Sequence, residues 1–212
     1  MTSLTILLEA IKGFDTAGAT HWATQAMQEQ VSPVEALDAV SGLMKEIGDR
    51  FASGDVWLPE LIGTAVAAQA GLAIVEQEIT RSRAQVERLG TVVIGTVFGD
   101  IHSIGKTMVT AMLSANGFKV IDLGMNVPSA AFIKAVTEHQ PDILAMSALL
   151  TTTAPEQRKV IEALREAGIR DQVKVMVGGG AITAQFAKQI GADGYGATAV
   201  DAVCLATQLM GK

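Results

Sequence analysis

The first part of the chain has the hydrophobic pattern of helices. From residue 4 to about residue 88, apolar residues recur every three or four positions, a spacing that places them on one face of a helix. Ser32 before Pro33 is a typical helix start. The breaks between the helical stretches fall at residues 13–16, 31–33 and 53–59. We therefore expect four helices in up-down order that bury their apolar faces in a bundle.

From residue 90 onward, short apolar runs rich in β-branched residues alternate with helical stretches. Such runs are typical of strands buried on both faces of a parallel sheet, and the alternation is typical of an α/β domain. The predicted strands are residues 91–97, 118–123, 142–147, 173–177 and 194–196. The predicted helices are residues 105–116, 128–139, 155–167, 181–190 and 200–210. Five strands fit the flavodoxin-like order, whose ligand site lies beside the first strand.

A charged segment at residues 80–89 separates the two patterns and is the predicted linker. The 212 residues are enough for two small domains. We expect a helical bundle domain at residues 1–88 and an α/β domain at residues 89–212.

Composition and charge limit the kinds of binding partner that we expect for the protein. The net charge is −6 and no basic cluster is present, so we expect no nucleic-acid partner. The longest apolar stretches are strand-sized or interrupted by charge, and the N-terminus lacks the features of a signal peptide, so we expect a cytoplasmic protein without a membrane partner. The single cysteine, Cys204, excludes an internal disulfide, and its apolar helical surroundings predict a buried thiol.

The loop after the first predicted strand carries the strongest chemical signal. Residues 99–106 read Gly-Asp-Ile-His-Ser-Ile-Gly-Lys, with Asp100 and His102 one residue apart. An imidazole in such a loop can bind a metal through one nitrogen while a carboxylate holds the other. A capping or surface histidine is the alternative interpretation.

Two further signals follow later strands: Ser147 and Leu149 after one apolar run, and Gly178 and Gly179 after the next. If these runs are parallel strands, their carboxyl ends meet at one edge of the sheet. Three loops then converge on one pocket.

Together these residues resemble the cobalamin-binding signature of the methionine synthase and corrinoid methyl-carrier family, Asp-x-His-x-x-Gly, then Ser-x-Leu, then Gly-Gly. The matching residues are Asp100, His102, Gly105, Ser147, Leu149, Gly178 and Gly179. The resemblance implies an N-terminal four-helix bundle cap, followed by a flavodoxin/Rossmann-like five-stranded parallel sheet. That sheet would bind cobalamin, as methylcobalamin or cob(I)alamin, with its cobalt.

The resemblance also implies a role for each site residue. His102 would be the cobalt ligand, Asp100 its hydrogen-bond partner, and Thr153 a hydroxyl that supports this pair. Thr153 also stands at the N-cap position of the predicted helix at Pro155, and both roles can hold at once. Ser147 and Leu149 would contact the nucleotide tail of the cofactor. Further cofactor contacts are expected from Ser103, Ile104, Gly105, Thr151, Gly178, Gly179 and Gly180, where the glycines let the backbone approach a bulky ligand.

The segment at residues 51–61 is similar to the family's cap segment. There, Phe51 and Leu58 would cover the upper face of the corrin, with Trp57 as a neighbour. From the residues alone, the interpretation is packing between helices.

The resemblance implies a corrinoid protein of a multi-component methyltransferase system. A substrate-specific methyltransferase would move a methyl group onto cobalt from a methoxy-aromatic compound, a methylamine or methanol. A second methyltransferase would pass it to tetrahydrofolate or a thiol, and a reductive activator would restore the corrinoid. His102 would bind and release cobalt as the methyl group comes and goes, and Asp100 would stabilise the released imidazolium. The chain has no room for a methyl-donor barrel, so we expect a carrier component and not a complete enzyme.

The sequence departs from the family pattern at two places. Ser103 stands where the loop commonly has a second acidic residue, and Gly180-Ala181 stands where the carriers usually have Ala-Pro. The alternative functions are a cobalamin-dependent sensor or regulator and the small subunit of an adenosylcobalamin mutase. Trp57 is not followed by the sensors' Glu-His pair, and the mutase subunit ordinarily lacks the bundle. A third alternative function is that of a flavodoxin-like phosphate or nucleotide binder. The absence of a Gly-x-x-x-x-Gly-Lys-Ser/Thr loop argues against this function.

Overall fold

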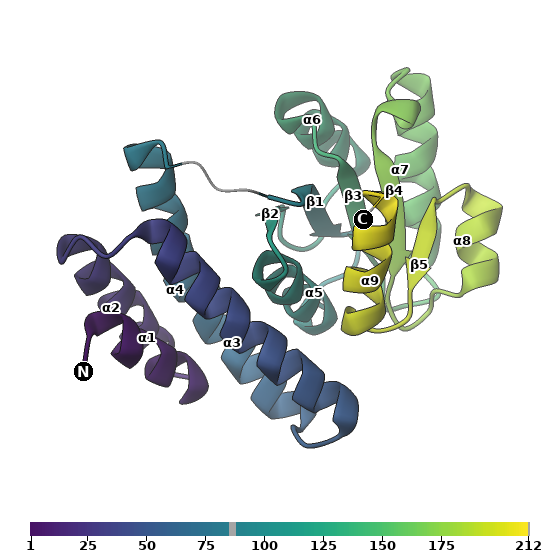
Figure 1. The fold of residues 1–212 in the computed structure, drawn as a ribbon. Coiled ribbons are helices and arrows are strands. Elements are labelled where there is room, and N and C mark those ends of the chain that lie inside the picture. The colour runs from purple at the N-terminus through teal and green to yellow at the C-terminus, as the bar shows by residue number, and fades with distance from the viewer. Residues whose placement is uncertain (85–87, 212) are drawn as a thin grey trace. The chain divides into compact units, whose positions relative to one another are not determined.

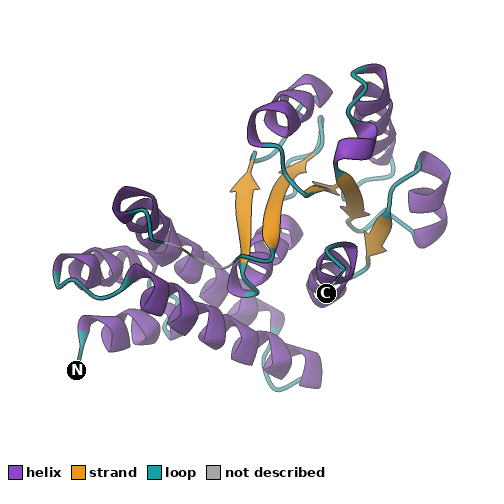
Figure 2. Cartoon of the chain, turned by 45° about the horizontal axis from the view of Figure 1, so that its top comes forward, coloured by secondary structure: helices purple, strands orange, loops and turns teal. Residues whose placement is uncertain are grey.

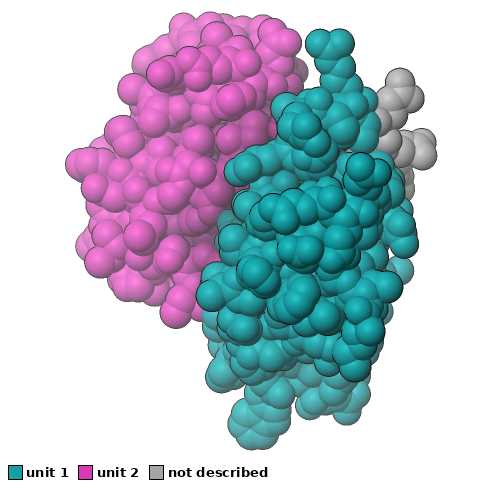
Figure 3. Space-filling model, turned by 90° about the vertical axis from the view of Figure 1, so that its left-hand side faces the viewer, with its two compact units in different colours: residues 1–87, 114–117 teal, residues 88–113, 118–212 magenta. Residues whose placement is uncertain are grey.

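The structure is a computed structural model that describes residues 1–84 and 88–211. The chain divides into two compact units, which Figure 3 colours separately: residues 1–87 with 114–117, and residues 88–113 with 118–212. Apart from residues 114–117, each unit is built from one of the two hydrophobic patterns in the sequence.

The first unit contains four helices that follow the predicted breaks. They are α1 (Ser3–Lys12), α2 (Thr16–Gln28), α3 (Pro33–Ser53) and α4 (Leu58–Ser82). Asp15 caps α2 by accepting a hydrogen bond from the backbone N–H of Gly18 at 2.8 Å, and Ser32 caps α3 in front of Pro33. Within the unit, α2 packs against α1 and α4, and α3 packs against α4.

Helix α4 is long and apolar enough to cross a membrane by length and composition. Its buried residues instead form the core of the helical unit. Leu61, Ala65, Ala68, Leu72 and Val75 lie along one side of α4, all of them buried. This spacing of three and four residues is that of a helix packed against neighbours in a bundle.

The second unit is built on a five-stranded parallel sheet of order β2-β1-β3-β4-β5, which confirms the predicted flavodoxin-like order. The strands are β1 (Gly90–Thr96), β2 (Phe118–Asp122), β3 (Ile143–Ser147), β4 (Lys174–Gly178) and β5 (Gly194–Gly196). The helices are α5 (Ile104–Ala115), α6 (Ser129–His139), α7 (Ala154–Glu166), α8 (Ala184–Ile190) and α9 (Ala199–Leu209), with a short 3₁₀ helix, η1 (Arg170–Gln172).

Helices cover both faces of this sheet (Figures 1 and 2). On one face, Val93 of β1 and Leu144 of β3 pack in a core that includes residues of α6, α7 and α8. On the other face, Val92 and Ile94 of β1 pack with residues of α5 and α9. Because side chains alternate along a strand, a strand in this position needs apolar residues on both faces, and this explains the continuous apolar runs in the sequence.

The observed elements differ from the predicted ones at a few ends. Helix α8 begins three residues later than predicted, because Thr183 caps it by accepting a hydrogen bond from the Phe186 N–H at 3.1 Å. The 3₁₀ helix η1 was not predicted. Part of the predicted linker, residues 80–82, belongs to α4, and residues 85–87 lie outside the described residues. The domain boundary at residues 88 and 89 therefore stays a prediction.

The strand register brings three loops to one edge of the sheet. Thr96 at the end of β1 pairs with Ser147 at the end of β3, and Ser147 pairs with Gly178 at the end of β4. The loops that follow these strands therefore start side by side at the carboxyl edge, where ligands bind in open α/β sheets.

Candidate functional site

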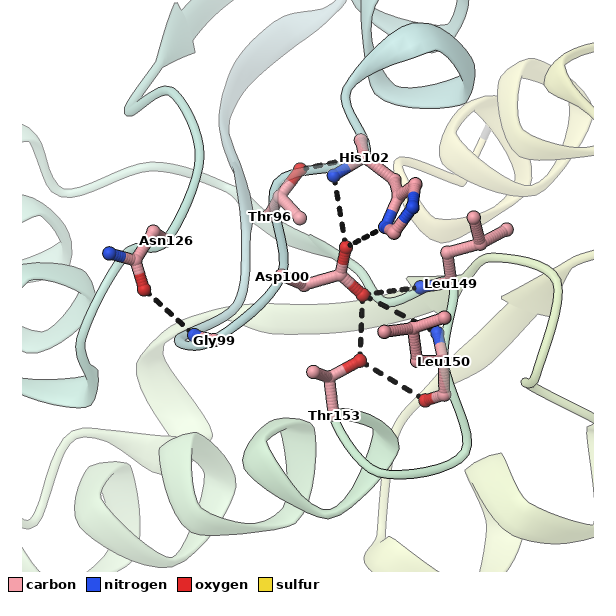
Figure 4. A network of polar contacts seen from close by, with 8 residues as sticks. All are labelled: Thr96, Gly99, Asp100, His102, Asn126, Leu149, Leu150 and Thr153. Atoms are coloured by element: carbon pink, nitrogen blue, oxygen red, sulfur yellow. Dashed lines mark hydrogen bonds and ion pairs between the residues drawn. The ribbon is translucent and has the colours of Figure 1, made fainter.

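The centre of the site is the carboxylate of Asp100, which is fully buried and accepts hydrogen bonds from five donors (Figure 4). Its Oδ1 accepts from the backbone N–H of His102 at 3.0 Å and from the Nδ1 of the same residue at 2.7 Å. Its Oδ2 accepts from the hydroxyl of Thr153 at 2.6 Å and from the backbone N–H groups of Leu149 at 2.7 Å and Leu150 at 3.4 Å. The loop after β1 is thus joined to the loop after β3.

These contacts set the charge of the carboxyl group. Burial by itself raises the pKa of Asp100, but hydrogen bonds from Thr153, from the backbone N–H groups of His102 and Leu149 and from the His102 ring outweigh it. The pKa therefore lies well below the ordinary range of an aspartic acid. Asp100 is an anion at neutral pH.

The anion determines which nitrogen of His102 is free. A carboxylate only accepts hydrogen bonds, so Nδ1 must carry the hydrogen that it shares with Asp100. In a neutral imidazole, Nε2 then keeps its lone pair. The side chain of His102 is 46% exposed, against 0% for Asp100. The Asp100–His102 pair therefore leaves Nε2 of His102 as the nitrogen atom that can bind a metal.

Thr153 occupies the N-cap position of α7, as the sequence indicates, but its side chain does not cap the helix. Its hydroxyl lies closer to Asp100 Oδ2, at 2.6 Å, than to the carbonyl oxygen of Leu150, at 3.1 Å. Because the hydroxyl has one hydrogen, the shorter contact identifies Asp100 as its acceptor. Thr151, in the same turn, is exposed.

The glycines of the site differ in how closely other atoms of the protein approach them. A Cβ on Gly179, where φ is +116°, would lie 2.0 Å from the carbonyl oxygen of Ala148, and one on Gly178 would lie 2.9 Å from that of Gly196. The packing of the protein itself therefore requires glycine at these two positions. A Cβ on Gly180 would lie 2.8 Å from the side chain of Leu149, which is flexible. Gly105, in the first turn of α5, has open space around it.

Exposed apolar side chains gather in the loops of the same edge. They come from the β1–α5, β2–α6 and β3–α7 connections and from the first residue of α5: Phe98, Ile101, Ile104, Met125, Leu149 and Leu150. Exposed apolar side chains in adjoining loops are typical of a binding surface. Of these residues, Ile104 and Leu149 are predicted site residues; Ser103 and Ser147 are partly buried.

The predicted cap residues belong to the helical unit. Trp57 is 77% exposed and Leu58 is 46% exposed, whereas Val56 between α3 and α4 is buried. Phe51, near the end of α3, is partly buried. Packing between helices therefore accounts for Val56 but leaves Trp57 and Leu58 exposed.

The described residues contain no group of three or more His, Cys, Asp and Glu side chains that could hold a metal ion. The two other histidines, His21 and His139, are exposed, as expected for surface groups, and His21 lies edge-to-face with Trp22 at 5.0 Å. Cys204 is exposed and not buried as predicted, because α9 buries Ala202, Val203 and Ala206.

Sequence reasoning missed three contacts of this site. Leu149 and Leu150 bind Asp100 through backbone N–H groups, which no side-chain pattern reveals. Asn126, from the loop after β2, accepts a hydrogen bond from the backbone N–H of Gly99 at 2.8 Å. In the sequence, Gly124-Met125 before Asn126 indicates a turn, but it does not indicate the contact between Asn126 and Gly99.

Comparison with known proteins identifies the family. Two profiles, each described as a B12 binding domain, match residues 4–76 and 90–204. The chain is 45% identical over 196 residues to the trimethylamine corrinoid protein of Methanosarcina barkeri, covering 92% of this chain and 90% of that protein. It is 41% identical over 216 residues to a corrinoid protein of Desulfitobacterium hafniense (strain Y51), covering 100% and 99%.

A solved structure is similar over both units. The methanol:cobalamin methyltransferase complex MtaBC from Methanosarcina barkeri contains a chain that matches with a TM-score of 0.79 and 31% identity, over 99% of this chain and 80% of that one. The predicted fold class, a helical region followed by a Rossmann-like cobalamin-binding domain, is thereby confirmed. The chain belongs to the family of corrinoid proteins with B12 binding domains, and cobalamin is its cofactor.

Proposed function

We propose that this protein carries a methyl group on the cobalt of cobalamin, between a substrate-specific methyltransferase and a second methyltransferase that uses tetrahydrofolate or a thiol. Bound cobalamin would supply the cobalt that accepts and gives up the methyl group. The protein would hold the cofactor and control the lower ligand of the metal. A reductive activator of the corrinoid would be a third partner, and the protein would work in the cytoplasm.

The observation that carries the proposal is the hydrogen bond between Asp100 and His102. Cobalamin brings cobalt already held by its corrin ring, so the protein has to supply only one axial nitrogen. His102 offers Nε2 on a half-exposed side chain, and Asp100 holds the other ring nitrogen as a donor. A carboxylate in this place fixes the tautomer and raises the basicity of the ligand. Imidazole is a suitable donor for a metal of this kind.

The remaining site residues would hold the rest of the cofactor. Ser103, Ile104 and Gly105 lie beside His102 at the start of α5, where an apolar and open surface would receive the corrin. Contacts to the nucleotide tail would come from the loops after β3 and β4, through Ser147, Leu149, Thr151, Gly178, Gly179 and Gly180. Phe51 and Leu58 of the helical unit would cover the other face of the corrin.

The relatives indicate the class of methyl donor. Three relatives that are 44–45% identical over 92% of this chain are named trimethylamine corrinoid proteins. We therefore expect a methylamine as the donor, delivered by a methyltransferase specific for it, ahead of methanol or a methoxy-aromatic compound.

The visible spectrum of the protein reconstituted with cobalamin tests the proposal. The wild type should show a cobalamin whose own benzimidazole is displaced and whose cobalt carries a protein imidazole. His102→Ala should lose the imidazole ligand, while His21→Ala and His139→Ala, which change exposed histidines, should retain it. Identical spectra for wild type and His102→Ala would remove His102 as the ligand.

Two glycine variants separate contact with the cofactor from the packing of the protein. Gly105→Ala fills open space in a helix, so we expect the cobalamin-free protein to be unchanged or up to about 1 kcal/mol more stable. Its cobalamin affinity should fall roughly tenfold or more, since one added methyl group meets the bound corrin. Gly179→Ala should destabilise the cobalamin-free protein by about 2 kcal/mol or more, because Cβ meets the Ala148 carbonyl.

Urea unfolding without cobalamin and equilibrium titration with cobalamin give the two readings for each glycine variant. Wild-type affinity in Gly105→Ala would show that this residue lies away from the cofactor. Wild-type stability in Gly179→Ala would show that the loop after β4 accommodates a side chain.

A further inference from the structure

The loop that carries Asp100 and His102 is held from two sides. The loop after β3 contacts the Asp100 carboxylate through Leu149 and Thr153. On the other side, the loop after β2 contacts the backbone around Asp100 through one residue, Asn126 (Figure 4). This second set of contacts touches neither His102 nor the carboxylate directly.

Asn126 makes two hydrogen bonds to adjacent residues of the histidine loop. Its side-chain Oδ1 accepts from the backbone N–H of Gly99 at 2.8 Å. Its own backbone N–H donates to the carbonyl oxygen of Asp100 at 3.0 Å. One bond holds the backbone N–H of Gly99, and the other holds the carbonyl group of Asp100. Together they limit rotation of the Gly99–Asp100 backbone, which carries the Asp100 side chain.

Both partners have backbone conformations that few residue types adopt. Gly99 has φ of +77° and stands third in a turn closed by a 3.1 Å hydrogen bond from the Asp100 N–H to the Val97 carbonyl. A positive φ at this position is a feature of type II turns. Asn126 itself has φ of +54°, a conformation that asparagine and glycine tolerate better than other residues. A residue here must therefore accept a left-handed backbone and also present an oxygen to Gly99.

The loop that holds Asn126 is itself anchored. Asp122, at the end of β2, forms an ion pair with Lys106 of α5, whose side chain is only 4% exposed, and accepts from the Gly124 N–H at 2.8 Å. Thr96 of β1 also donates its N–H to the Gly124 carbonyl oxygen at 3.0 Å. The segment from Asp122 to Asn126 thus contacts the histidine loop before His102, through Asn126, and helix α5 after that loop, through the ion pair of Asp122 with Lys106.

We propose that Asn126 is a positioning residue for the cobalt ligand: by fixing the Gly99–Asp100 backbone, it sets the orientation of the Asp100 carboxylate and, through it, of the His102 imidazole. This inference rests on the proposed function, in which His102 binds cobalt. Asn126 contacts no reacting atom and acts only through Asp100.

Two substitutions separate the side-chain oxygen from the backbone conformation. Asn126→Gly keeps the left-handed backbone and removes the oxygen, whereas Asn126→Asp keeps both the conformation and an acceptor. Amide hydrogen exchange in the cobalamin-free protein gives the first reading. The Gly99 N–H should exchange roughly three- to tenfold faster in Asn126→Gly and at the wild-type rate in Asn126→Asp. The Val97 N–H, which donates to the Ser147 carbonyl oxygen, should be unchanged in both variants.

The second reading is the ratio of cobalt(II) with a histidine ligand to cobalt(II) without one, from electron paramagnetic resonance of the reconstituted protein. We expect this ratio to fall roughly three- to tenfold in Asn126→Gly and to be restored in Asn126→Asp. In a His102→Ala background, Asn126→Gly should change nothing further, because its effect passes through His102.

The outcomes distinguish this inference from the proposed function. A wild type without a histidine signal overturns the proposed function, and the inference with it. A wild type with the signal and an Asn126→Gly variant with the same ratio overturns the inference alone. If the Gly99 N–H exchanges faster in Asn126→Gly but the ratio of cobalt(II) with and without a histidine ligand does not change, Asn126 stabilises only the turn. This result also contradicts the proposal.

Discussion

Asp100→Asn is expected to lower the free energy of unfolding of the cobalamin-free protein by about 3 kcal/mol at pH 7. The carboxylate accepts five hydrogen bonds in a fully buried position. An amide has one oxygen and one NH₂ group, so the substitution places donors opposite the N–H groups or the hydroxyl that now donate to Asp100. At least one of these buried groups is then left without an acceptor.

The same substitution should change how stability depends on pH. The pKa of Asp100 is lowered in the folded protein, while an unfolded chain has an aspartate pKa of about 3.9. Above about pH 5 both states are ionised, and the contribution of Asp100 is fully present. As the pH falls further, the unfolded chain binds a proton that the folded protein does not, so stability is lost. Between about pH 5 and about pH 2, the wild type should lose roughly 2 kcal/mol more than Asp100→Asn.

Urea unfolding of the cobalamin-free proteins at several pH values measures both effects. The difference between the two curves isolates Asp100 from the other carboxylates that titrate in the same range. Asp171→Asn, which changes an exposed aspartate of the same unit, is the matched control and should unfold at pH 7 with a free energy close to that of the wild type. If Asp100→Asn ran parallel to the wild type, within about 0.5 kcal/mol, the five hydrogen bonds would not stabilise the anion.

Asp122→Asn is expected to destabilise the protein by about 3 kcal/mol, and more than Lys106→Met does. The Lys106 ammonium is almost completely buried and pairs with Asp122, which keeps 23% of its side chain exposed. Removing the carboxylate leaves a buried cation without its partner, which is strongly unfavourable. Removing the cation leaves an aspartate that water still reaches, and methionine fills the space of the lysine chain, so the loss should be about 1 kcal/mol or less.

The double variant distinguishes the ion pair from other effects of each residue. Once Lys106 is methionine, Asp122→Asn should cost little, so the double variant should resemble Lys106→Met in its urea midpoint. Equal losses in the two single variants, or losses that simply add, would show that the pair does not control stability.

Much of the fold was accessible from the sequence, because local patterns encode it. The apolar runs predicted all five strands, and helix starts such as Ser32-Pro33 are set by residues a few positions apart. Errors fell where a single side chain decides an element's end, as at Thr183, which delays α8. Cys204 was wrongly placed in the core because its immediate neighbours, Val203 and Leu205, are apolar, although the residues on its own face of the helix, at spacings of three and four, include Asp201, Thr207 and Gln208.

The site was less accessible, because its contacts join distant loops. The Asp100 and His102 pair is local, and the sequence placed the two residues within reach of each other. The backbone donors of Leu149 and Leu150, and the side chain of Asn126, depend on how neighbouring strands end. Likewise, the clash that a Cβ on Gly179 would make with Ala148 is visible only in three dimensions, whereas the predicted contact of Gly179 with the cofactor stays a prediction.

The most direct test of the central claim is electron paramagnetic resonance of the cobalt(II) protein in which only histidine carries ¹⁵N. If His102 is the cobalt ligand, each cobalt line should be split by one ¹⁵N nucleus into a doublet, where unlabelled protein gives a triplet. The doublet should be absent from His102→Ala. A triplet from the labelled protein would mean that the benzimidazole of the cofactor holds the cobalt, and it would contradict the role given to His102.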